Sequence, residues 1–583
     1  MRGQTVIVTF TLLRTLRRIC SAALLMAAIA NPGSAAAGKK VAGTPGTGQQ
    51  DATAGGGASS TVLRELVAAG RLSDLRWPDF SDYQVLVNGF YDSMHYSLVW
   101  QRNNQPSQQA QQVIEVLQRA DSKGLNAEDY DGSRWPQRLA SLQSSGSPAD
   151  QASFDAALTV CLMRYISDLH IGRVNPQHMK FNFDVGSKKY DLPAFLQEKM
   201  INGTNVRAEL DAVEPPFDGY KRTQRVLQRY LELSRQDDGE QLPVPPKPVE
   251  PGSSYDGTRR LARLLNLLGD LPSGSVAADN SNVYDNRLAA AVKHFQERHG
   301  LVADGRLGAK TVKQLNVPLA LRVEQLRLTL ERWRWVPYEF NQPPIVVNIP
   351  EFRLRAYHKD GTVGLATNVI VGKSYRHQTP VFERDMKYVV FRPYWNVPPS
   401  ILRSELVPAV NKNRSYLADK RYEVVTSGGK LVSSGLVTND ILQQLRSGKL
   451  QVRQKPGPAN ALGLVKLMFP NEYNVYLHST PSSALFSQSR RDFSHGCIRV
   501  EKSSELAGWV LRDKPEWALE RVRAAMQSGT DNLSVTLTNP IPVLILYGTA
   551  VVDEQQEVHF FDDIYGHDSS LQKALARGYP YPR

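Results

Sequence analysis

Apolar positions between residues 61 and 240 recur every three or four residues, which is the period of an amphipathic helix. The clearest runs are "STVLRELVAAG", "QQAQQVIEVLQRADSKG" and "ASFDAALTVCLMRYISDLHIG", and each ends on or near a glycine. The next stretch, "QLPVPPKPVEPGSS" at 241–254, is rich in proline and predicts a stiff linker. The pattern therefore predicts a helical scaffold domain over residues 61–254, with this linker at its end.

A compact helical unit is expected over residues 255–318. "TRRLARLLNLLGDL", "YDNRLAAAVKHFQERHG" and "LVADGRLGAKTVKQLNV" each carry a helical pattern, with Asp304-Gly305 and Gly308 at the turns. The unit resembles the peptidoglycan-binding module, whose pattern includes "AVKHFQERHGLVADGRLGAKT". A small three-helix bundle without a ligand is the alternative.

From about residue 344 the period changes to that of strands. "PIVVNIPEFRLRAYHKDG", "GLATNVIVG", "KYVVFRPYWNVP" and "YNVYLHST" are β-rich with turn residues between them, and "VLILYGTAVVDEQQEVHFFDD" follows the same pattern. A mainly-β domain is predicted over 340–550, with a mixed, polar stretch at about 400–462 read as a helical capping insertion. Residues 551–583 form a C-terminal extension. The predicted fold class is multidomain α+β.

The N-terminus has the features of an export signal. Arg14, Arg17 and Arg18 precede the apolar run "ICSAALLMAAIA", and "NPGSAAAG" follows it. We predict a signal peptide over residues 1–37, a flexible Gly/Ala/Ser/Thr-rich linker over 38–60, and a periplasmic location for the remainder. An uncleaved membrane anchor is the alternative. No later stretch reaches the roughly 18–20 apolar residues of a membrane span.

Charge modifies this picture only slightly. Lys and Arg number 70 against 57 Asp and Glu, which gives a net charge of +13. Such an excess favours anionic surroundings, and export argues for a cell-wall polymer or a lipid surface rather than nucleic acid. The basic residues are dispersed, so an ordinary solvated surface explains them as well.

Two cysteines remain after the signal peptide, and their contexts differ. Cys161 lies within a helical apolar pattern and is expected in the core. Cys497 lies in "RDFSHGCIRV", which has no such pattern, and a free thiol in an oxidising compartment needs a reason. Two distant cysteines make no disulfide framework, and the absence of a C-x-x-C pair argues against thiol redox exchange.

A nucleophilic cysteine needs a base, for which two histidines stand upstream of Cys497. His495 is two residues away and is as well placed to support the loop. His478 ends the strand-like run "YNVYLHS", where alternation puts Tyr476 on the same face, and it is the preferred base. Gly496 allows a sharp turn whose amides could stabilise an oxyanion. Arg499 could hold a substrate carboxylate, or it could be an ordinary surface arginine.

The segment "HSTPSSALFSQSRRDFSHGCIRV" resembles the catalytic motif of the L,D-transpeptidase (YkuD-type) family. That motif has a histidine, some fifteen residues, and then Ser/Thr-His-Gly-Cys with Arg or Asn two positions on. Here fifteen residues separate His478 from Ser494, and Arg499 follows Cys497 by two. The chain is similar to the large, YcbB-like periplasmic members, and "LHIGRVNP", "FRPYWNVPPSIL" and "VHFFDDIYGHD" extend the likeness over most of residues 60–570.

The resemblance implies further site residues. The carbonyl of Ser479 would accept from the base, Tyr476 would line the pocket, and Trp395 would contact substrate or serve the core. It also implies a thioester on Cys497, formed from a peptidoglycan tetrapeptide with loss of D-alanine and resolved by another stem's amine into a 3→3 cross-link.

Two other functions stay open. A hydrolase would use the same residues with water as acceptor, and a wall-binding scaffold would leave the cysteine incidental. No cofactor is implied, and no metal, since the histidines show no cluster at ligand spacing. The expected partners are peptidoglycan stem peptides and glycan, with other cell-wall synthases as further candidates.

Overall fold

The computed structural model describes residues 54–272, 282–375 and 377–581. The predicted signal peptide and most of the predicted linker at 38–60 lie outside this part of the chain. Within it, no helix is both long and apolar enough to cross a membrane.

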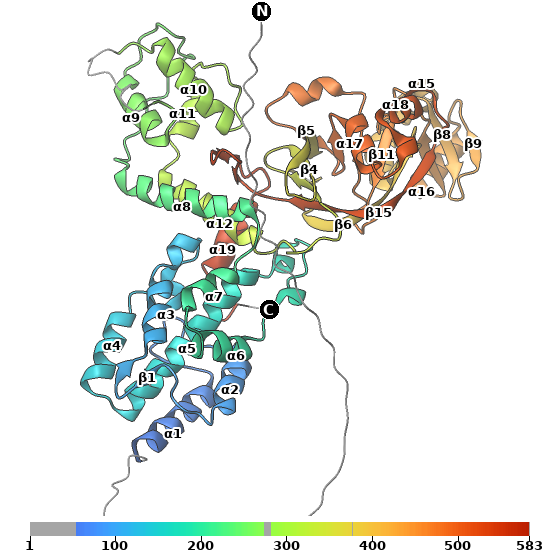
Figure 1. Cartoon of the computed structure of the whole chain (residues 1–583). Helices are drawn as coiled ribbons and strands as arrows, with labels where there is room; N and C mark the ends of the chain where they lie inside the picture. The colour runs from blue at the N-terminus through green and yellow to red at the C-terminus, as the bar shows by residue number, and fades with distance from the viewer. Residues whose placement is uncertain (1–53, 273–281, 376, 582–583) are drawn as a thin grey trace, which may run out of the picture. The chain divides into compact units, whose positions relative to one another are not determined.

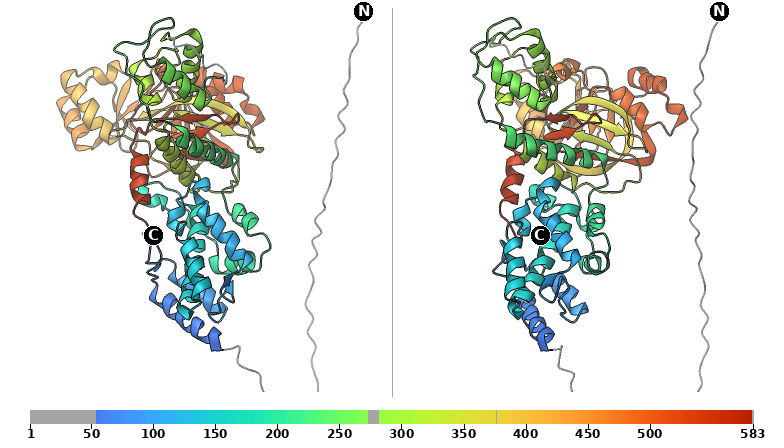
Figure 2. Two further views of the ribbon diagram at one scale, coloured as in Figure 1. Left: turned by 90° about the vertical axis from the view of Figure 1, so that its left-hand side faces the viewer. Right: turned by 60° about the vertical axis from the view of Figure 1, so that its left-hand side comes forward.

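The first region is helical, as the spacing predicts, and its helices lie together in blue to green in both sets of views (Figures 1 and 2). The long helix α5 is buried on nearly all sides, and Cys161, 1% exposed, lies in its core as predicted. The helices are α1 (Ala54–Ala69), α2 (Gln84–Ser93), α3 (Gln108–Gln118), α4 (Trp135–Ser144), α5 (Pro148–Ile171), α6 (Leu192–Phe195), α7 (Val206–Ala212) and α8 (Asp218–Gln236).

The predicted flexible linker is wrong at its end, because α1 begins at Ala54. Glycines at 55–57 are poor helix formers, so the sequence predicts a linker here instead of a helix. Tertiary packing overrides this preference: Leu63 and Val67 are fully buried, and α1 packs against α5. The hydroxyl of Ser59 also donates to Gln151 of α5 at 2.6 Å.

The predicted three-helix unit is present as α9 (Thr258–Leu268), α10 (Asn286–Arg298) and α11 (Ala309–Leu315). Its apolar side chains share one core with α8 and with α12 (Leu319–Trp333). The side-chain carboxylate of Asp285 caps α10 by accepting from the amide of Leu288, and Gly305 adopts the left-handed conformation expected at the turn.

A nine-stranded sheet forms the C-terminal domain, in the order β13-β5-β14-β12-β11-β6-β15-β3-β4. Most neighbouring strands are antiparallel, but β12 pairs β14, β13 pairs β5 and β15 pairs β3 in parallel. Helices α17 (Ser503–Val510) and α18 (Leu519–Ser528) add apolar side chains to its core. The strands are β3 (Ile345–Asn348), β4 (Arg353–Tyr357), β5 (Val363–Gly372), β6 (Phe382–Phe391), β11 (Val465–Met468), β12 (Leu477–His478), β13 (Asp492–Ser494), β14 (Ile498–Val500) and β15 (Leu533–Leu546). The multidomain α+β prediction is confirmed.

The insertion is only partly helical, which differs from the prediction. Helices such as α14 (Val407–Lys412) and α16 (Asn439–Ser447) accompany a four-stranded sheet in the order β7-β10-β8-β9. The insertion has its own apolar core, so it folds as a small α/β subdomain. Its strands are β7 (Trp395–Asn396), β8 (Tyr422–Thr426), β9 (Leu431–Ser433) and β10 (Leu450–Gln454).

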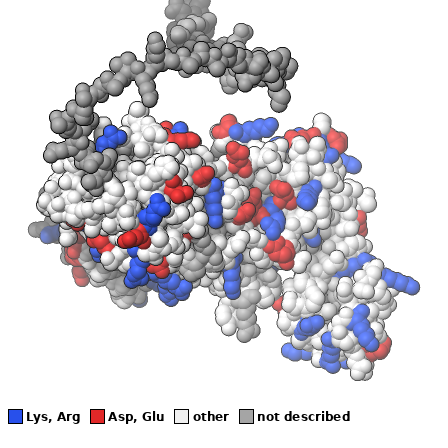
Figure 3. Space-filling model, turned by 90° about the horizontal axis from the view of Figure 1, so that it is seen from below, with Lys and Arg blue, Asp and Glu red and all other residues white. Residues whose placement is uncertain are grey.

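The last segment returns to the helical regions. The hairpin of β16 (Ala550–Val552) and β17 (Val558–Phe560) shares the core of the three-helix unit. Helix α19 (His567–Leu575) follows, and its Asp568 pairs with Arg332 of α12 at 2.5 Å. On the face drawn in Figure 3, basic and acidic side chains are interspersed, which fits the dispersed charge in the sequence.

Candidate active site

Cys497 lies between β13 and β14, inside the nine-stranded sheet. The parallel pairing of β12 with β14 puts His478 opposite Arg499. Tyr476 and Cys497 directly precede these two strands: the amide of Ile498 donates to the carbonyl of Tyr476 at 3.1 Å, and the side chains of Tyr476 and Cys497 interact. The sheet thus brings the two parts of the motif together across nineteen positions of the sequence.

A hydrogen-bonded turn presents the cysteine. The hydroxyl of Ser494 donates to the carbonyl of Cys497 at 2.5 Å and accepts from the amide of Gly496 at 3.1 Å. Gly496 has a φ of +112°, a region that side chains disfavour. The hydroxyl of Thr379 donates to the carbonyl of Gly496 at 2.8 Å and fixes the turn from outside. Because the Gly496 amide already donates to Ser494, it is not free to bind an oxyanion in this geometry.

His478 is held in one orientation and one tautomer. Its Nδ1 donates to the carbonyl of Ser479 at 2.6 Å, which leaves Nε2 with a lone pair. The Ser479 hydroxyl in turn accepts from the amides of Leu464 and Val465. His478 is 4% exposed. Burial, and then the charge of Arg499, lower the pKa of His478 to about 3, so the ring is neutral at neutral pH.

The thiol rests in its protonated form. Burial raises the pKa of Cys497, while the hydrogen bonding of Tyr476 and the charges of Lys466 and Arg499 oppose that rise. The thiol donates to the carbonyl of Asn474, with the sulfur 3.7 Å from the oxygen, rather than to the ring of His478. The pair is therefore a thiol and a neutral imidazole, and a proton moves only when the thiol rotates or reacts.

Residues 343–543, which contain all of these groups, match the family described as "L,D-transpeptidase catalytic domain". Residues 343–543 are thus similar in sequence to an L,D-transpeptidase catalytic domain. The resemblance seen in the sequence is confirmed. Residues 85–227 match "Scaffold domain" and residues 254–315 match "Putative peptidoglycan binding domain".

A relative and a solved structure are similar to this chain. A Haemophilus influenzae protein named "Putative L,D-transpeptidase" is 31% identical over 264 residues, which are 45% of this chain and 51% of that protein. The match thus spans about half of the relative. A crystal structure of L,D-transpeptidase (Yku) from Stackebrandtia nassauensis covers 52% of this chain and 97% of that one, at 14% identity and a TM-score of 0.22. That score is too low to support an argument about fold.

The other histidine of the motif connects the C-terminal domain to its insertion. Nε2 of His495 lies 2.7 Å from a carboxylate oxygen of Glu405, which belongs to the inserted subdomain. The His495 ring also lies 4.9 Å from that of His377. This geometry supports the loop-supporting alternative for His495 over a role as base.

Three further groups surround the thiol. The Lys466 ammonium lies 4.0 Å from the centre of the Tyr476 ring, and that ring is 5.7 Å from the His478 ring. Arg499 is half-buried, and burial lowers its pKa. Trp395 lies in β7 of the insertion, where it hydrogen-bonds Tyr476, so the insertion contacts the wall of the site.

Sequence reasoning missed Lys466, Thr379 and Glu405. Lys466 lies opposite His478 because β11 pairs β12, and no local pattern shows that register. The only signal was its place as a lone charge in the apolar strand "LVKLM".

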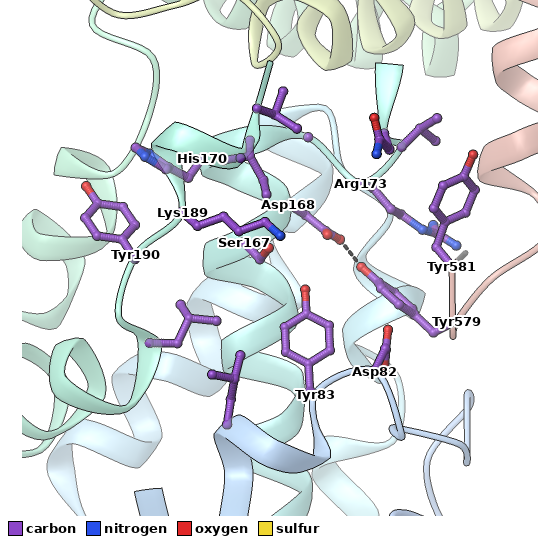
Figure 4. Close-up of a pocket in the computed structure, with 18 of the residues that line it drawn as sticks. Asp82, Tyr83, Ser167, Asp168, His170, Arg173, Lys189, Tyr190, Tyr579 and Tyr581 are labelled. Atoms are coloured by element: carbon purple, nitrogen blue, oxygen red, sulfur yellow. Dashed lines mark hydrogen bonds between the residues drawn. The ribbon is translucent and has the colours of Figure 1, made fainter. Parts of the chain in front are cut away.

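A cavity of about 250 Å³ lies elsewhere, in the scaffold region (Figure 4). The "LHIGRVNP" segment lines it together with Tyr579 and Tyr581 from the C-terminal end. The hydroxyl of Tyr579 donates to the carboxylate of Asp168 in α5. None of its lining residues belongs to the Cys497 site. The cavity lies where Tyr579 and Tyr581 pack against the scaffold region.

Proposed function

We propose that this protein is a cysteine-dependent L,D-transpeptidase that forms 3→3 cross-links in peptidoglycan outside the cytoplasm. The observation that supports the proposal is the parallel pairing of β12 with β14, because His478 ends the first of these strands and Cys497 directly precedes the second. A histidine with a fixed tautomer beside an unpaired cysteine is the arrangement that acyl transfer through a thioester requires.

In the first step the Cys497 sulfur attacks the carbonyl that joins the third residue of a tetrapeptide stem to its terminal D-alanine. Nε2 of neutral His478 takes the thiol proton as the carbon–sulfur bond forms. The tetrahedral intermediate collapses, the carbon–nitrogen bond breaks, and His478 returns the proton to the leaving amine of D-alanine. The product is a thioester on Cys497.

In the second step the side-chain amine of another stem attacks the thioester carbonyl. His478 takes a proton from that amine. The carbon–sulfur bond then breaks, and the departing thiolate of Cys497 takes the proton from His478. The energy of the original peptide bond passes through the thioester, so no nucleotide is needed. A positive charge at Arg499 suits a substrate carboxylate near the reacting carbonyl.

The charge distribution around the thiol supports this order of events. Lys466 and Arg499 both stabilise a thiolate once the proton leaves, and neither can act as the base while charged. Neutral His478 is the remaining base on this face. The role of Ser494, Gly496 and Thr379 is to hold the turn that aims the sulfur.

The insertion is proposed to act as a lid, because Trp395 and Glu405 connect it to the catalytic groups. Exclusion of water would favour an amine acceptor over hydrolysis. The predicted periplasmic location and the binding of glycan by residues 255–318 agree with a wall polymer as substrate. Contacts with other cell-wall synthases belong to the scaffold region.

The test uses purified full chain and a tetrapeptide stem. Mass spectrometry should find a thioester adduct on Cys497, with loss of D-alanine, and later a cross-linked dimer. Cys497→Ala should abolish the adduct, and His478→Ala should reduce it by about 10²–10⁴-fold. His358→Ala, an exposed histidine of the same domain, is the matched control.

Two outcomes would separate the competing functions. Only free tripeptide, with no dimer, would assign a hydrolase to the same site. Unchanged cross-linking in cells that carry Cys497→Ala, together with loss of function on deletion of residues 255–318, would assign a wall-binding scaffold.

A further inference from the structure

Three metal-ligating side chains gather at the turn of the β16–β17 hairpin, far along the chain from the catalytic motif. One possible ligand atom from each of Asp553, Glu557 and His559 lies within 4.8 Å of the other two. Among the residues that the structure describes, this is the group of three or more such side chains that could hold a metal ion. The sequence analysis expected no such cluster.

The hairpin itself builds the first pair. The amide of Asp553 donates to the carbonyl of Glu557 at 3.0 Å, and the amide of Glu557 donates to Oδ1 of Asp553 at 2.9 Å. The turn thus engages one oxygen of the Asp553 carboxylate. The other oxygen, Oδ2, lies 3.0 Å from Nε2 of His559.

A second histidine approaches from α10 of the three-helix unit. Nε2 of His294 lies 3.2 Å from Oε1 of Glu557, and its Nδ1 lies 2.7 Å from Oδ1 of Asp270. Asp270 is fully buried at its side chain and is held by Arg298. Side chains that hydrogen-bond a metal-binding carboxylate from outside the ligand group commonly fix its orientation.

These contacts position the Glu557 carboxylate over the hairpin turn. Nε2 of His294 lies 3.2 Å from Oε1 of Glu557, and Asp270 fixes the orientation of the histidine ring from the other side. Glu557 is therefore held beside Asp553 and His559 by a side chain from a different element.

The distances and the donor types suit a transition metal. Ligand atoms about 2.0–2.2 Å from a tetrahedral Zn²⁺ are about 3.3 Å from one another. Nε2 of His559 and Oδ2 of Asp553 are 3.0 Å apart, and one possible ligand atom from each of the three side chains lies within 4.8 Å of the other two. Imidazole nitrogens favour Zn²⁺ over Ca²⁺ or Mg²⁺, which prefer oxygen ligands. Two carboxylates also balance the charge of a divalent ion. The four side chains are all partly exposed, so an ion could enter from solvent.

We propose that Asp553, Glu557 and His559 bind a structural Zn²⁺ ion with solvent as the fourth ligand, that His294 orients Glu557, and that the site thereby fastens the β16–β17 hairpin to α10. The guanidinium of Arg298 already joins these two elements, because its Nη1 donates to the carbonyl of Val558 at 3.0 Å. A metal ion adds a second attachment at the hairpin's tip. The site stands apart from Cys497 and does not depend on the proposed transferase activity.

The experiment uses untagged full chain carrying Cys497→Ala, which removes the Cys497 thiol as a competing ligand. After chelation, calorimetric titration with ZnCl₂ should show about one ion bound per chain. Zn²⁺ should also raise the midpoint of thermal unfolding, because it binds the folded state. Titration with Co²⁺ should give the visible absorption of a tetrahedral site with nitrogen and oxygen ligands.

Matched variants locate the ion. His559→Gln and Asp553→Asn should each weaken Zn²⁺ binding at least about tenfold, as His294→Gln should, while Glu554→Gln, an exposed acid on the same turn, should leave the affinity unchanged. Circular dichroism of each chelated variant checks the fold. Absence of binding, or equal affinity in His559→Gln and Glu554→Gln, would overturn the proposal and assign these contacts to protonated histidines.

Discussion

His478 is buried, hydrogen-bonded and close to a fixed positive charge, and these features decide how it can act as a base. A thiolate–imidazolium pair would need a histidine that holds a proton at neutral pH. Burial and Arg499 prevent this, and burial also raises the pKa of Cys497. The Cys497–His478 site therefore resembles a hydroxyl–histidine pair in its resting charge state, with proton transfer coupled to attack.

The first prediction concerns pH. Because the pKa of His478 is about 3, the base form persists from about pH 5 to about pH 8, and kcat/KM for thioester formation should show no acidic limb near pH 6.5. Alkylation of Cys497 by iodoacetamide should rise about tenfold per pH unit up to and above its ordinary pKa of 9.0. Stopped-flow profiles of both reactions provide the check. A limb near pH 6.5 would mean that the ring is exposed or paired with a thiolate.

The same shift has a consequence for stability, with a definite sign. The unfolded chain binds a proton on His478 below about pH 6.5, whereas the folded chain binds it only near pH 3. The contribution of His478 to the free energy of unfolding is thus complete above pH 6.5 and is lost as the pH falls toward 3. Glu or Asp groups titrate in the same window, so the His478→Gln variant is the comparison that isolates it.

Lys466 gives a second prediction. Its charge opposes the rise in the thiol's pKa, so Lys466→Met should raise the pKa of Cys497 further and slow alkylation near pH 8. Lys502→Met, an exposed lysine five residues past the cysteine, is the control. Equal rates in the two variants would show that Lys466 does not act on the thiol.

At the scale of elements, strand pairing does most of the work in the active site. The turn that carries Cys497 is held by hydroxyls from two different segments, Ser494 within it and Thr379 from the loop before β6. Thr379 also accepts from the amide of Gly372 at 2.9 Å, and it is 1% exposed. One side chain therefore connects the end of β5 to the cysteine turn.

Replacement of Thr379 by Val should break both hydrogen bonds with little change in shape. A buried amide and a buried carbonyl would lose their partner, which costs about 1–3 kcal/mol in the free energy of unfolding. Transpeptidation should fall with it, because the turn that aims the sulfur loosens. Thr379→Ser keeps the hydroxyl and should restore most of both losses. Denaturant unfolding and single-turnover acylation are the measurements, and equal stability of all three proteins would contradict this role.

The insertion allows a prediction about partitioning between acceptors. Glu405→Gln should weaken the contact with His495. Since both side chains are partly exposed, the interaction free energy lost is about 0.2–1 kcal/mol. We expect the ratio of hydrolysed to cross-linked product to rise about two- to fivefold. Asp440→Asn, an acid in the first turn of α16, is the control. An unchanged ratio would argue against a lid function.

Much of the fold could be predicted from the sequence because the spacing of apolar residues and the positions of turn residues agree with the tertiary structure. Helices such as α5 and α10 follow their apolar spacing, and the motif spacing led directly to Cys497 and His478. Contacts between segments that are distant in the sequence could not be predicted. Lys466 reaches the site only through the register of β11, and the sheet of the insertion was hidden because its strands are short and lie among polar loops. The helix at 54–60 exists because of packing against α5, despite three glycines.

At the scale of the whole chain, the C-terminal end is fastened to the scaffold region near its beginning. Tyr579 is 7% exposed, and its hydroxyl donates to Asp168, which also accepts from Tyr130. The ring lies against two arginines, with the guanidinium carbons of Arg164 and Arg173 at 4.3 Å and 4.6 Å from its centre. The chain end thereby becomes part of the scaffold's polar interior.

Tyr579→Phe tests this attachment. Burial raises the pKa of Asp168 to about 7, and the tyrosine hydrogen bond favours its charged form. The loss of the hydroxyl should therefore cost about 1–3 kcal/mol above pH 7, where Asp168 is ionised, and less near pH 5, where it is protonated. Hydrogen exchange of the α5 amides at both pH values measures the local effect without assuming a single unfolding step. Tyr581→Phe, two residues later and more exposed, should change little. If Tyr579→Phe costs as much at pH 5 as at pH 8, the tyrosine stabilises the scaffold by ring packing alone, and its hydroxyl does not govern the charge of Asp168.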